Sequence, residues 1–165
     1  MKKIFMLFTV ACVLVSCGML AGASKEEQEQ ISKAVTAAVK KADLSIDVQT
    51  FFPVGEPMVS LDTPYTLTVT KSRVNGRLPY FGESHTALIA NVDEIGIFFD
   101  NAETENYVLD DSKKKEGKYN ISFRAYSGTT KWDVELGVST DGSVEISCRC
   151  ANRSAISYQG IVNFE

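Results

Sequence analysis

Between residue 43 and the C-terminus, apolar and polar side chains alternate with a period of two. In "KYNISFRAY" at 118–126, Tyr119, Ile121 and Phe123 alternate with polar residues. Successive side chains of a β-strand point to opposite faces, so this pattern predicts strands with one buried face and one wet face. Similar runs occupy 44–49, 65–70, 131–138, 144–150 and 156–164. Asn75-Gly76 and Asp141-Gly142 lie between runs and favour hairpins, hence antiparallel pairing.

The segment before this pattern has the period of a helix. Apolar residues recur at three- and four-residue spacing at Ile31, Ala34, Val35, Ala38, Val39 and Ala42. Ser24 and Glu27 fit a capping box, and Lys40 and Lys41 suit the negative end of the helix dipole. A coiled-coil partner is the alternative, but the stripe is short and rich in alanine. We expect one amphipathic helix lying close against the sheet.

These two patterns define the predicted fold class. We expect a mainly β (α+β) fold in which one N-terminal amphipathic helix packs on a strongly curved antiparallel sheet of about nine or ten strands. The sheet forms a flattened barrel or, as the alternative, a two-sheet sandwich. Gly96, Gly137 and Gly160 fall inside strand patterns, where glycine often marks a bend. A chain of 165 residues suits one domain, which we place at 25–165.

The first 16 residues have the organisation of an export signal. Lys2 and Lys3 precede the apolar run "IFMLFTVACVLV" at 4–15. A helix that spans a bilayer needs about 20 apolar residues, so this run is too short to span one. We therefore read residues 1–16 as a signal peptide that is removed from the mature chain.

The stretch "LVSCG" at 14–18 resembles a bacterial lipobox. In lipoproteins of this type the cysteine is linked to diacylglycerol and carries fatty acyl chains such as palmitate, which anchor it when two or more are present. The resemblance implies lipidation of Cys17 and a tether over residues 17–24. It places the chain in the cell envelope, at the periplasmic or surface face of the outer membrane. The alternative is an ordinary signal peptide cut near Ala21 or Ala23, which would give a soluble secreted protein.

The charge of the mature chain limits its partners. Loss of Lys2 and Lys3 lowers the number of basic residues from 17 to 15, against 21 acidic residues. A net acidic chain has no general attraction for nucleic acid or anionic headgroups. The lysines at 113–115 and 118 form one local exception, which we read as a solvated hairpin tip. We expect a membrane contact through the lipid, a small ligand or an envelope protein as partner, and no nucleic acid.

The chain resembles the family catalogued as domain of unknown function 4251, small lipoproteins from anaerobic gut bacteria of the Bacteroides group. "LPYFG" at 78–82 and "NRSAISYQG" at 152–160 are the specific motifs, and "FFPVGE" at 51–56 and "GIFFD" at 96–100 accompany them. The resemblance implies a β-rich fold and an envelope location, and it implies no activity. In the family pattern an arginine or alanine follows "LPYFG", whereas Glu83, Ser84 and His85 follow it here.

The stretch "RLPYFGESH" at 77–85 holds the single histidine of the chain. "GESHT" at 82–86 lacks the last glycine of a nucleophile elbow, and a strand-like segment follows it where an elbow needs a helix. We expect Tyr80 and Phe81 to cap one end of the barrel. As the alternative, Tyr80, Phe81 and His85 form an exposed rim that contacts a ligand.

Cys148 and Cys150 fall on the buried face of one predicted strand. Residues i and i+2 of a strand lie about 6.6 Å apart, whereas the Cβ atoms of a disulfide lie about 3.8 Å apart. We favour two free buried thiols, with a strained disulfide and a metal site as alternatives. Seven carboxylates between 93 and 111 do not have the spacing of an EF-hand, so we read them as solvated charge.

No catalytic set, metal site or cofactor motif emerges from these residues. We expect a lipid-anchored envelope protein that acts as a non-catalytic binding module for a small ligand or an envelope component. Two alternatives remain open: a hydrolase that uses carboxylates or His85, and a structural or assembly subunit that works through an exposed strand edge.

Overall fold

The computed structural model describes residues 24–53, 55, 57–80 and 96–164. They form one α-helix, nine strands and a short 3₁₀ helix between β5 and β6. The elements are α1 (Lys25–Lys41), β1 (Asp43–Phe52), β2 (Val59–Thr70), β3 (Arg73–Leu78), β4 (Ile97–Glu103), β5 (Glu105–Asp110), η2 (Lys114–Glu116), β6 (Lys118–Ser127), β7 (Thr130–Ser139), β8 (Ser143–Arg149) and β9 (Ile156–Asn163).

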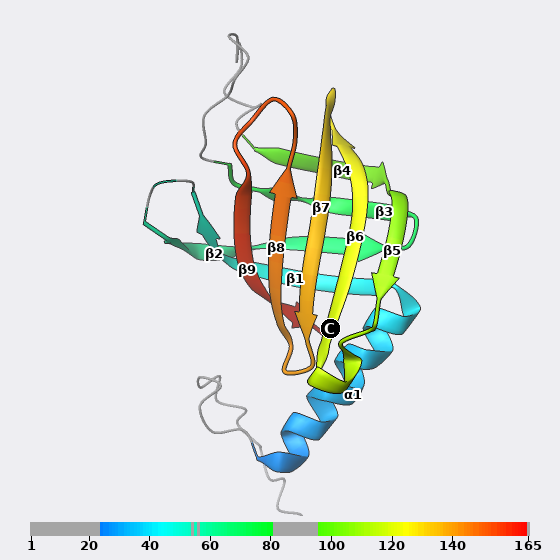
Figure 1. The fold of residues 1–165 in the computed structure, drawn as a ribbon. Coiled ribbons are helices and arrows are strands. Elements are labelled where there is room, and N and C mark those ends of the chain that lie inside the picture. The colour runs from blue at the N-terminus through cyan, green and yellow to red at the C-terminus, as the bar shows by residue number, and fades with distance from the viewer. Residues whose placement is uncertain (1–23, 54, 56, 81–95, 165) are drawn as a thin grey trace, which may run out of the picture.

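The nine strands form one antiparallel sheet in the order β4-β3-β2-β1-β9-β8-β7-β6-β5. The sheet curls so far that β1 to β4 cross behind β6 to β9, as Figure 1 shows. At the seam, the backbone N–H of Phe98 on β4 donates to Ser127 Oγ at the end of β6 over 2.8 Å. The predicted helix and curved antiparallel sheet are therefore confirmed. The sheet is nearly closed and resembles a barrel.

Bulges produce the curvature at three points. The register shifts between Val48 and Thr50 of β1, opposite Gly160. Asn101 and Asn106 adopt positive φ values of 46° and 53° at further shifts on β4 and β5. Bulges of this kind bend a strand and increase its twist. Gly96 forms a bend directly before β4, whereas the expected bend at Gly137 is wrong, because the pairing runs regularly through that residue.

The inward face of the sheet forms a single apolar core. The largest fully buried side chains include Trp132, Tyr119, Tyr158 and Phe99. Among the described residues, no charged or polar residue is buried. The interior of the barrel is therefore a packed core, and the polar chemistry of the described part of the chain lies on its outside.

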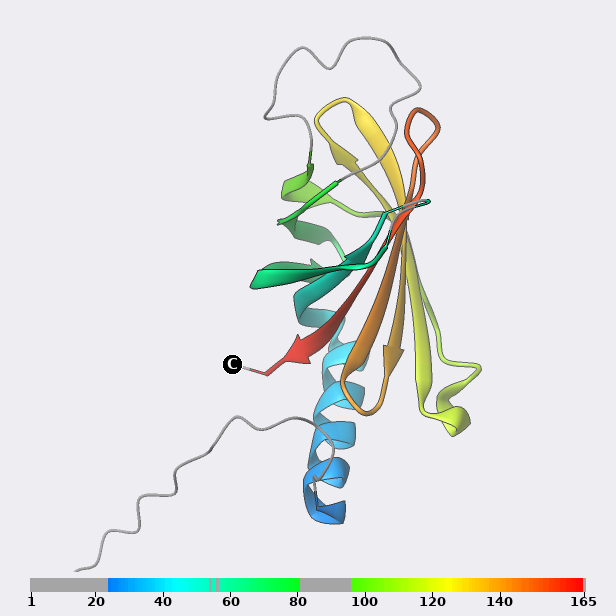
Figure 2. The same cartoon turned by 90° about the vertical axis from the view of Figure 1, so that its left-hand side faces the viewer.

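Helix α1 lies at one end of the barrel, which we call the helix end (Figures 1 and 2). The predicted capping box is present: Ser24 N–H donates to Glu27 Oε2 over 2.8 Å, and Glu27 N–H donates to Ser24 Oγ over 3.3 Å. Val35 and Val39 are fully buried, and Thr36 Oγ1 lies 3.2 Å from the hydroxyl of Tyr119. The alanine-rich stripe lets the helix close this end of the core. Within the described ranges, α1 is too short and too polar to cross a bilayer.

Candidate functional site

Of the three predicted rim residues, Tyr80 is the one that the structure describes; Phe81 and His85 lie outside the described residues. The ring of Tyr80 is 3% exposed and packs edge-on against Trp132, with 5.8 Å between centroids. Its hydroxyl donates to the carbonyl of Ser154 over 2.9 Å, and burial raises its pKa. The expectation of an exposed rim is therefore wrong for Tyr80, because its ring caps the core at the end opposite the helix.

We call that end of the barrel the tyrosine end. The guanidinium of Arg153 lies over the ring of Tyr80, 5.4 Å from its centroid. A depression of 340 Å³ between β4 and the β6–β7 hairpin is lined by Phe98, Trp132 and Arg153, among others. Trp132 and Arg153 both contact Tyr80, so this depression adjoins the predicted ligand site.

Both predicted cysteines are free thiols in the structure. The prediction that both are buried is wrong for Cys150, which follows the last residue of β8 and is partly exposed. Cys148 is fully buried on β8, and burial raises the pKa of its thiol to about 12. A thiol with so high a pKa carries almost no thiolate at neutral pH, so it is a poor nucleophile. Among the described residues, no three His, Cys, Asp or Glu side chains gather closely enough to hold a metal ion.

The carboxylates predicted between 93 and 111 do not converge where the structure describes them. Asp93 and Glu94 lie outside the described residues. Glu105 pairs with Lys131 over 2.6 Å. Asp110 is exposed, and the backbone N–H of Ser112 lowers the pKa of its carboxyl. The described carboxylates lie on or directly after β4 and β5, which are the two edge strands of the sheet, and they form no closed site.

A hollow in the described surface lies on the outer face of the sheet. We call it the polar groove. It has a volume of 680 Å³ and continues into a second hollow of 440 Å³ that shares four of its residues. One cross-strand row of the groove consists of Asp110, Asn120, Gly137, Glu145, Gln159 and Thr50. The neighbouring row consists of Ser122, Glu135, Ser147, Ser157 and Phe52.

Small side chains make this part of the face concave. Gly137 has no side chain, and Ser122, Ser147 and Ser157 are short. Longer side chains stand around them, such as Glu145 beside Gly137. The groove therefore follows from the sizes of residues that the strand register brings side by side.

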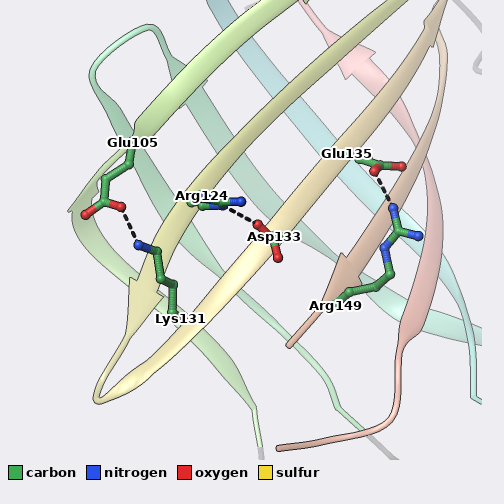
Figure 3. A network of polar contacts seen from close by, with 6 residues as sticks. All are labelled: Glu105, Arg124, Lys131, Asp133, Glu135 and Arg149. Carbon is green, nitrogen blue, oxygen red and sulfur yellow. Dashed lines mark hydrogen bonds and ion pairs between the residues drawn. The ribbon is translucent and has the colours of Figure 1, made fainter. Parts of the chain in front are cut away.

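Figure 3 shows three ion pairs on strands β5 to β8. Arg124, Asp133 and Arg149 form the cross-strand row next to the row of Glu135, so they border the groove. Lys131 pairs with Glu105 and Arg124 with Asp133, each over 2.6 Å. Arg149 on β8 pairs with Glu135 on β7, inside the groove. These side chains are between 41% and 57% exposed, so water screens the charges of each pair. The main effect of the ion pairs is to hold these side chains in place.

Most polar side chains of the groove are available to a ligand. In the part of the chain that the structure describes, no hydrogen bond or ion pair engages the side chains of Asn120, Glu145, Ser147, Ser157 or Gln159. This site could not be recognised from the sequence alone, because each of its residues is common on the solvent-exposed face of a strand. The signal that could have revealed the groove is the number of serine and glycine residues at facing positions. This signal can be recognised only once the strand register is known.

A family model described as "Domain of unknown function (DUF4251)" matches residues 26–162, which covers the helix and nearly all of the sheet. The chain belongs to the DUF4251 family. This confirms the resemblance that the motifs predicted.

A solved structure supports the DUF4251 fold. A DUF4251 family protein from Bacteroides eggerthii superposes with a TM-score of 0.58 over 82% of this chain and 90% of that chain. The two sequences are 13% identical, so the likeness concerns the fold alone. No curated protein matches this sequence.

The two specific DUF4251 motifs meet at the tyrosine end. Tyr80 of "LPYFG" donates to the carbonyl of Ser154 in "NRSAISYQG", and Tyr158 of the second motif donates to the carbonyl of Pro79 over 2.8 Å. Arg153 also covers the ring of Tyr80. The described parts of both motifs thus form one structural cap at the tyrosine end.

Proposed function

We propose that this DUF4251 protein is a lipid-anchored cell-envelope protein that binds a small ligand or another envelope component in the polar groove, without catalysis. One observation carries the binding role: a hollow of 680 Å³ is lined mainly by polar side chains, most of which no other described residue engages. Sites for small molecules typically measure about 300–1,000 Å³. In the described part of the chain, apolar side chains fill the inward face of the sheet.

The location of the helix supports the anchoring part of the proposal. The tether at 17–24 leads directly into α1, at the helix end of the barrel. Eight extended residues reach about 28 Å. Acyl chains on Cys17 would therefore hold the helix end close to the bilayer and leave the outer face of β6 to β9 accessible from the side.

We rank the hydrolase alternative below binding. A general acid needs a raised pKa near the working pH. In the groove, Glu135 is paired with Arg149, and the pKa of Asp110 is lowered. These carboxylates are better suited to accept hydrogen bonds from a ligand than to transfer protons.

Site-specific photo-crosslinking in the native host tests the binding role. A photoreactive amino acid replaces Gln159 in the groove or, as the control, the exposed Glu103 on β4. We expect an adduct at position 159 that Gly137→Tyr abolishes, and none at position 103. Equal adducts at both positions, or none at position 159, would overturn the proposal.

Intact mass spectrometry of the protein from its native envelope tests the anchor. We expect a chain that begins at Cys17 and carries the mass of a diacylglycerol and fatty acid. Cys17→Ala should move the protein into the soluble fraction. A chain that begins elsewhere, or that lacks the added mass, would contradict the anchor.

A second candidate function, assembly through a strand edge, rests on β2. Strand β3 pairs with Leu67–Val69 of β2, so no described strand covers that edge of residues 59–66. Met58, Val59 and Tyr65 are 64%, 41% and 39% exposed there. If the edge assembles, light scattering should give a dimer that Tyr65→Lys dissociates; a monomer at all concentrations would remove this candidate.

A further inference from the structure

We infer that the polar groove recognises a neutral carbohydrate, bound as a short linear oligosaccharide across strands β6 to β9 and β1. This inference rests on the proposed binding function and names the ligand class. It follows from the hydrogen-bonding groups, the charge balance and the shape of the groove.

The hydrogen-bonding groups of the groove suit a ligand rich in hydroxyls. Asn120 and Gln159 each present an amide that both donates and accepts, the serines do the same with one hydroxyl, and Glu145 accepts. Each hydroxyl of a sugar also donates and accepts. A mixed array of this kind can satisfy neighbouring hydroxyls, whereas an anion needs mainly donors. Asn120 on β6 and Gln159 on β9 lie in one cross-strand row, on either side of Gly137 and Glu145.

The charges of the groove balance one another. Glu135 is neutralised by Arg149. The remaining lining charges are the carboxylates of Asp110 and Glu145 and the ammonium groups of Lys113 and Lys118. A nucleic acid or a polyanion needs a clearly positive surface. Two carboxylates in the groove oppose such a ligand, so a ligand without net charge fits best.

The shape of the groove suits a chain that lies across the strands. Its main row crosses six strands, from Asp110 on β5 to Thr50 on β1. Neighbouring strands lie about 4.8 Å apart, so this row is roughly 24 Å long. Phe52 ends the second row with a partly exposed ring, against which the C–H face of a sugar can pack. An open row with a ring at one end favours several linked sugars over a single compact metabolite.

Gly137 allows the groove to be filled without disturbing the strand. A Cβ atom at this position would lie 3.8 Å from Glu145 Cβ and 4.0 Å from Asn120 Oδ1, which are ordinary contacts. The side chain in Gly137→Tyr would therefore occupy the floor of the groove. The matched control is Glu103→Tyr, which places the same ring on the exposed face of β4, outside the groove.

The test is isothermal titration calorimetry on the chain from residue 18 onward. The probes are neutral hexasaccharides of α-linked glucose, β-linked glucose, xylose and mannose, with a heparin hexasaccharide as the anionic comparison. We expect one or more neutral probes to bind and heparin not to bind. Gly137→Tyr should weaken the binding at least tenfold, Asn120→Ala and Gln159→Ala about three- to tenfold each, and Glu103→Tyr should leave it unchanged.

Three results would overturn the inference: no neutral probe binds, heparin binds more tightly than every neutral probe, or Gly137→Tyr binds as well as the unaltered chain. The crosslinking experiment separates this failure from failure of the binding function. An adduct at position 159 that survives periodate, which cleaves sugar diols, together with no calorimetric binding, would retain the binding function and reject carbohydrate. An absence of both signals would reject both.

Discussion

The backbone of Gly160 on β9 lies against the carbonyl of Asp47 on β1. A Cβ atom added to Gly160 would stand 2.4 Å from Asp47 O, well inside van der Waals contact. This approach occurs at the register shift between Val48 and Thr50, where the two halves of the barrel join. The curvature of the sheet at this junction therefore requires a residue without a side chain.

Gly160→Ala should destabilise the protein by about 1–3 kcal/mol, because the backbone of β1 or β9 must move to admit the methyl group. Chemical denaturation followed by tryptophan fluorescence measures the change, since Trp132 is buried. Gly137→Ala is the matched control and should change the free energy of unfolding by less than about 1 kcal/mol. Equal losses in the two variants would show that the close approach to Asp47 has no energetic role.

We expect removal of the hydroxyl group to have opposite effects on stability at two tyrosines. Tyr158→Phe removes a hydrogen bond to the carbonyl of Pro79 and should cost about 1 kcal/mol. The hydroxyl of Tyr107 is buried and has no partner among the described residues, so Tyr107→Phe should be neutral or stabilising. Urea unfolding of the two variants gives the comparison. A larger loss for Tyr107→Phe than for Tyr158→Phe would contradict this account of the two hydroxyls.

The buried thiol of Cys148 predicts a loss of stability in alkaline solution. Burial raises the pKa of this thiol from 9.0 to about 12, and burial also raises the pKa of Tyr158 above 10.0. The unfolded chain releases these protons first, so raising the pH above about 9 favours unfolding. Cys148→Ala should make the decline in unfolding free energy shallower by about 1 kcal/mol per pH unit between pH 9 and pH 12. An unchanged slope would argue that Cys148 ionises in the folded chain.

We also expect the thiols of Cys148 and Cys150 to differ in their reactivity toward thiol reagents. Cys148 is 0% exposed, whereas Cys150 is partly exposed at the end of β8. A thiol reagent at pH 8 should modify Cys150 in the folded chain and reach Cys148 only after denaturant is added. Mass spectrometry of the labelled peptides distinguishes the two sites, and simultaneous labelling under native conditions would contradict the buried position of Cys148.

The exposed ion pair between Arg124 and Asp133 should contribute little to stability. A double-mutant cycle with Arg124→Ala and Asp133→Ala should give a coupling energy below about 1 kcal/mol, which declines as salt is added. A larger, salt-independent coupling would mean that the pairs in Figure 3 stabilise the sheet rather than border the groove.

The strands and the helix could be predicted because their signals are local. The alternation around Tyr119 and Phe123 places one face of β6 in the core, whichever strands pair with it. Ser24 and Glu27 cap α1 through contacts three residues apart. Each such signal lies within one turn or one strand, so the amino-acid sequence specifies it directly.

The candidate site could not be predicted in the same way. Gly137, Glu145 and Gln159 lie far from Phe52 in the sequence and come together through the pairing of β7, β8, β9 and β1. Each of these residues by itself is common on the solvent-exposed face of a strand. The burial of Tyr80 also depends on distant groups, Trp132 and the carbonyl of Ser154.

The amino-acid sequence by itself determined the helix, the strands and the inward face of each strand, because hydrophobic periodicity acts between near neighbours. The tertiary structure alone decided the strand order, the near closure of the sheet and the groove on its outer face. These depend on bulges at Asn101, Asn106 and opposite Gly160, the last of which sets the register between β1 and β9, far apart in the chain. Register determines which side chains become neighbours, and in this protein the neighbours form the site.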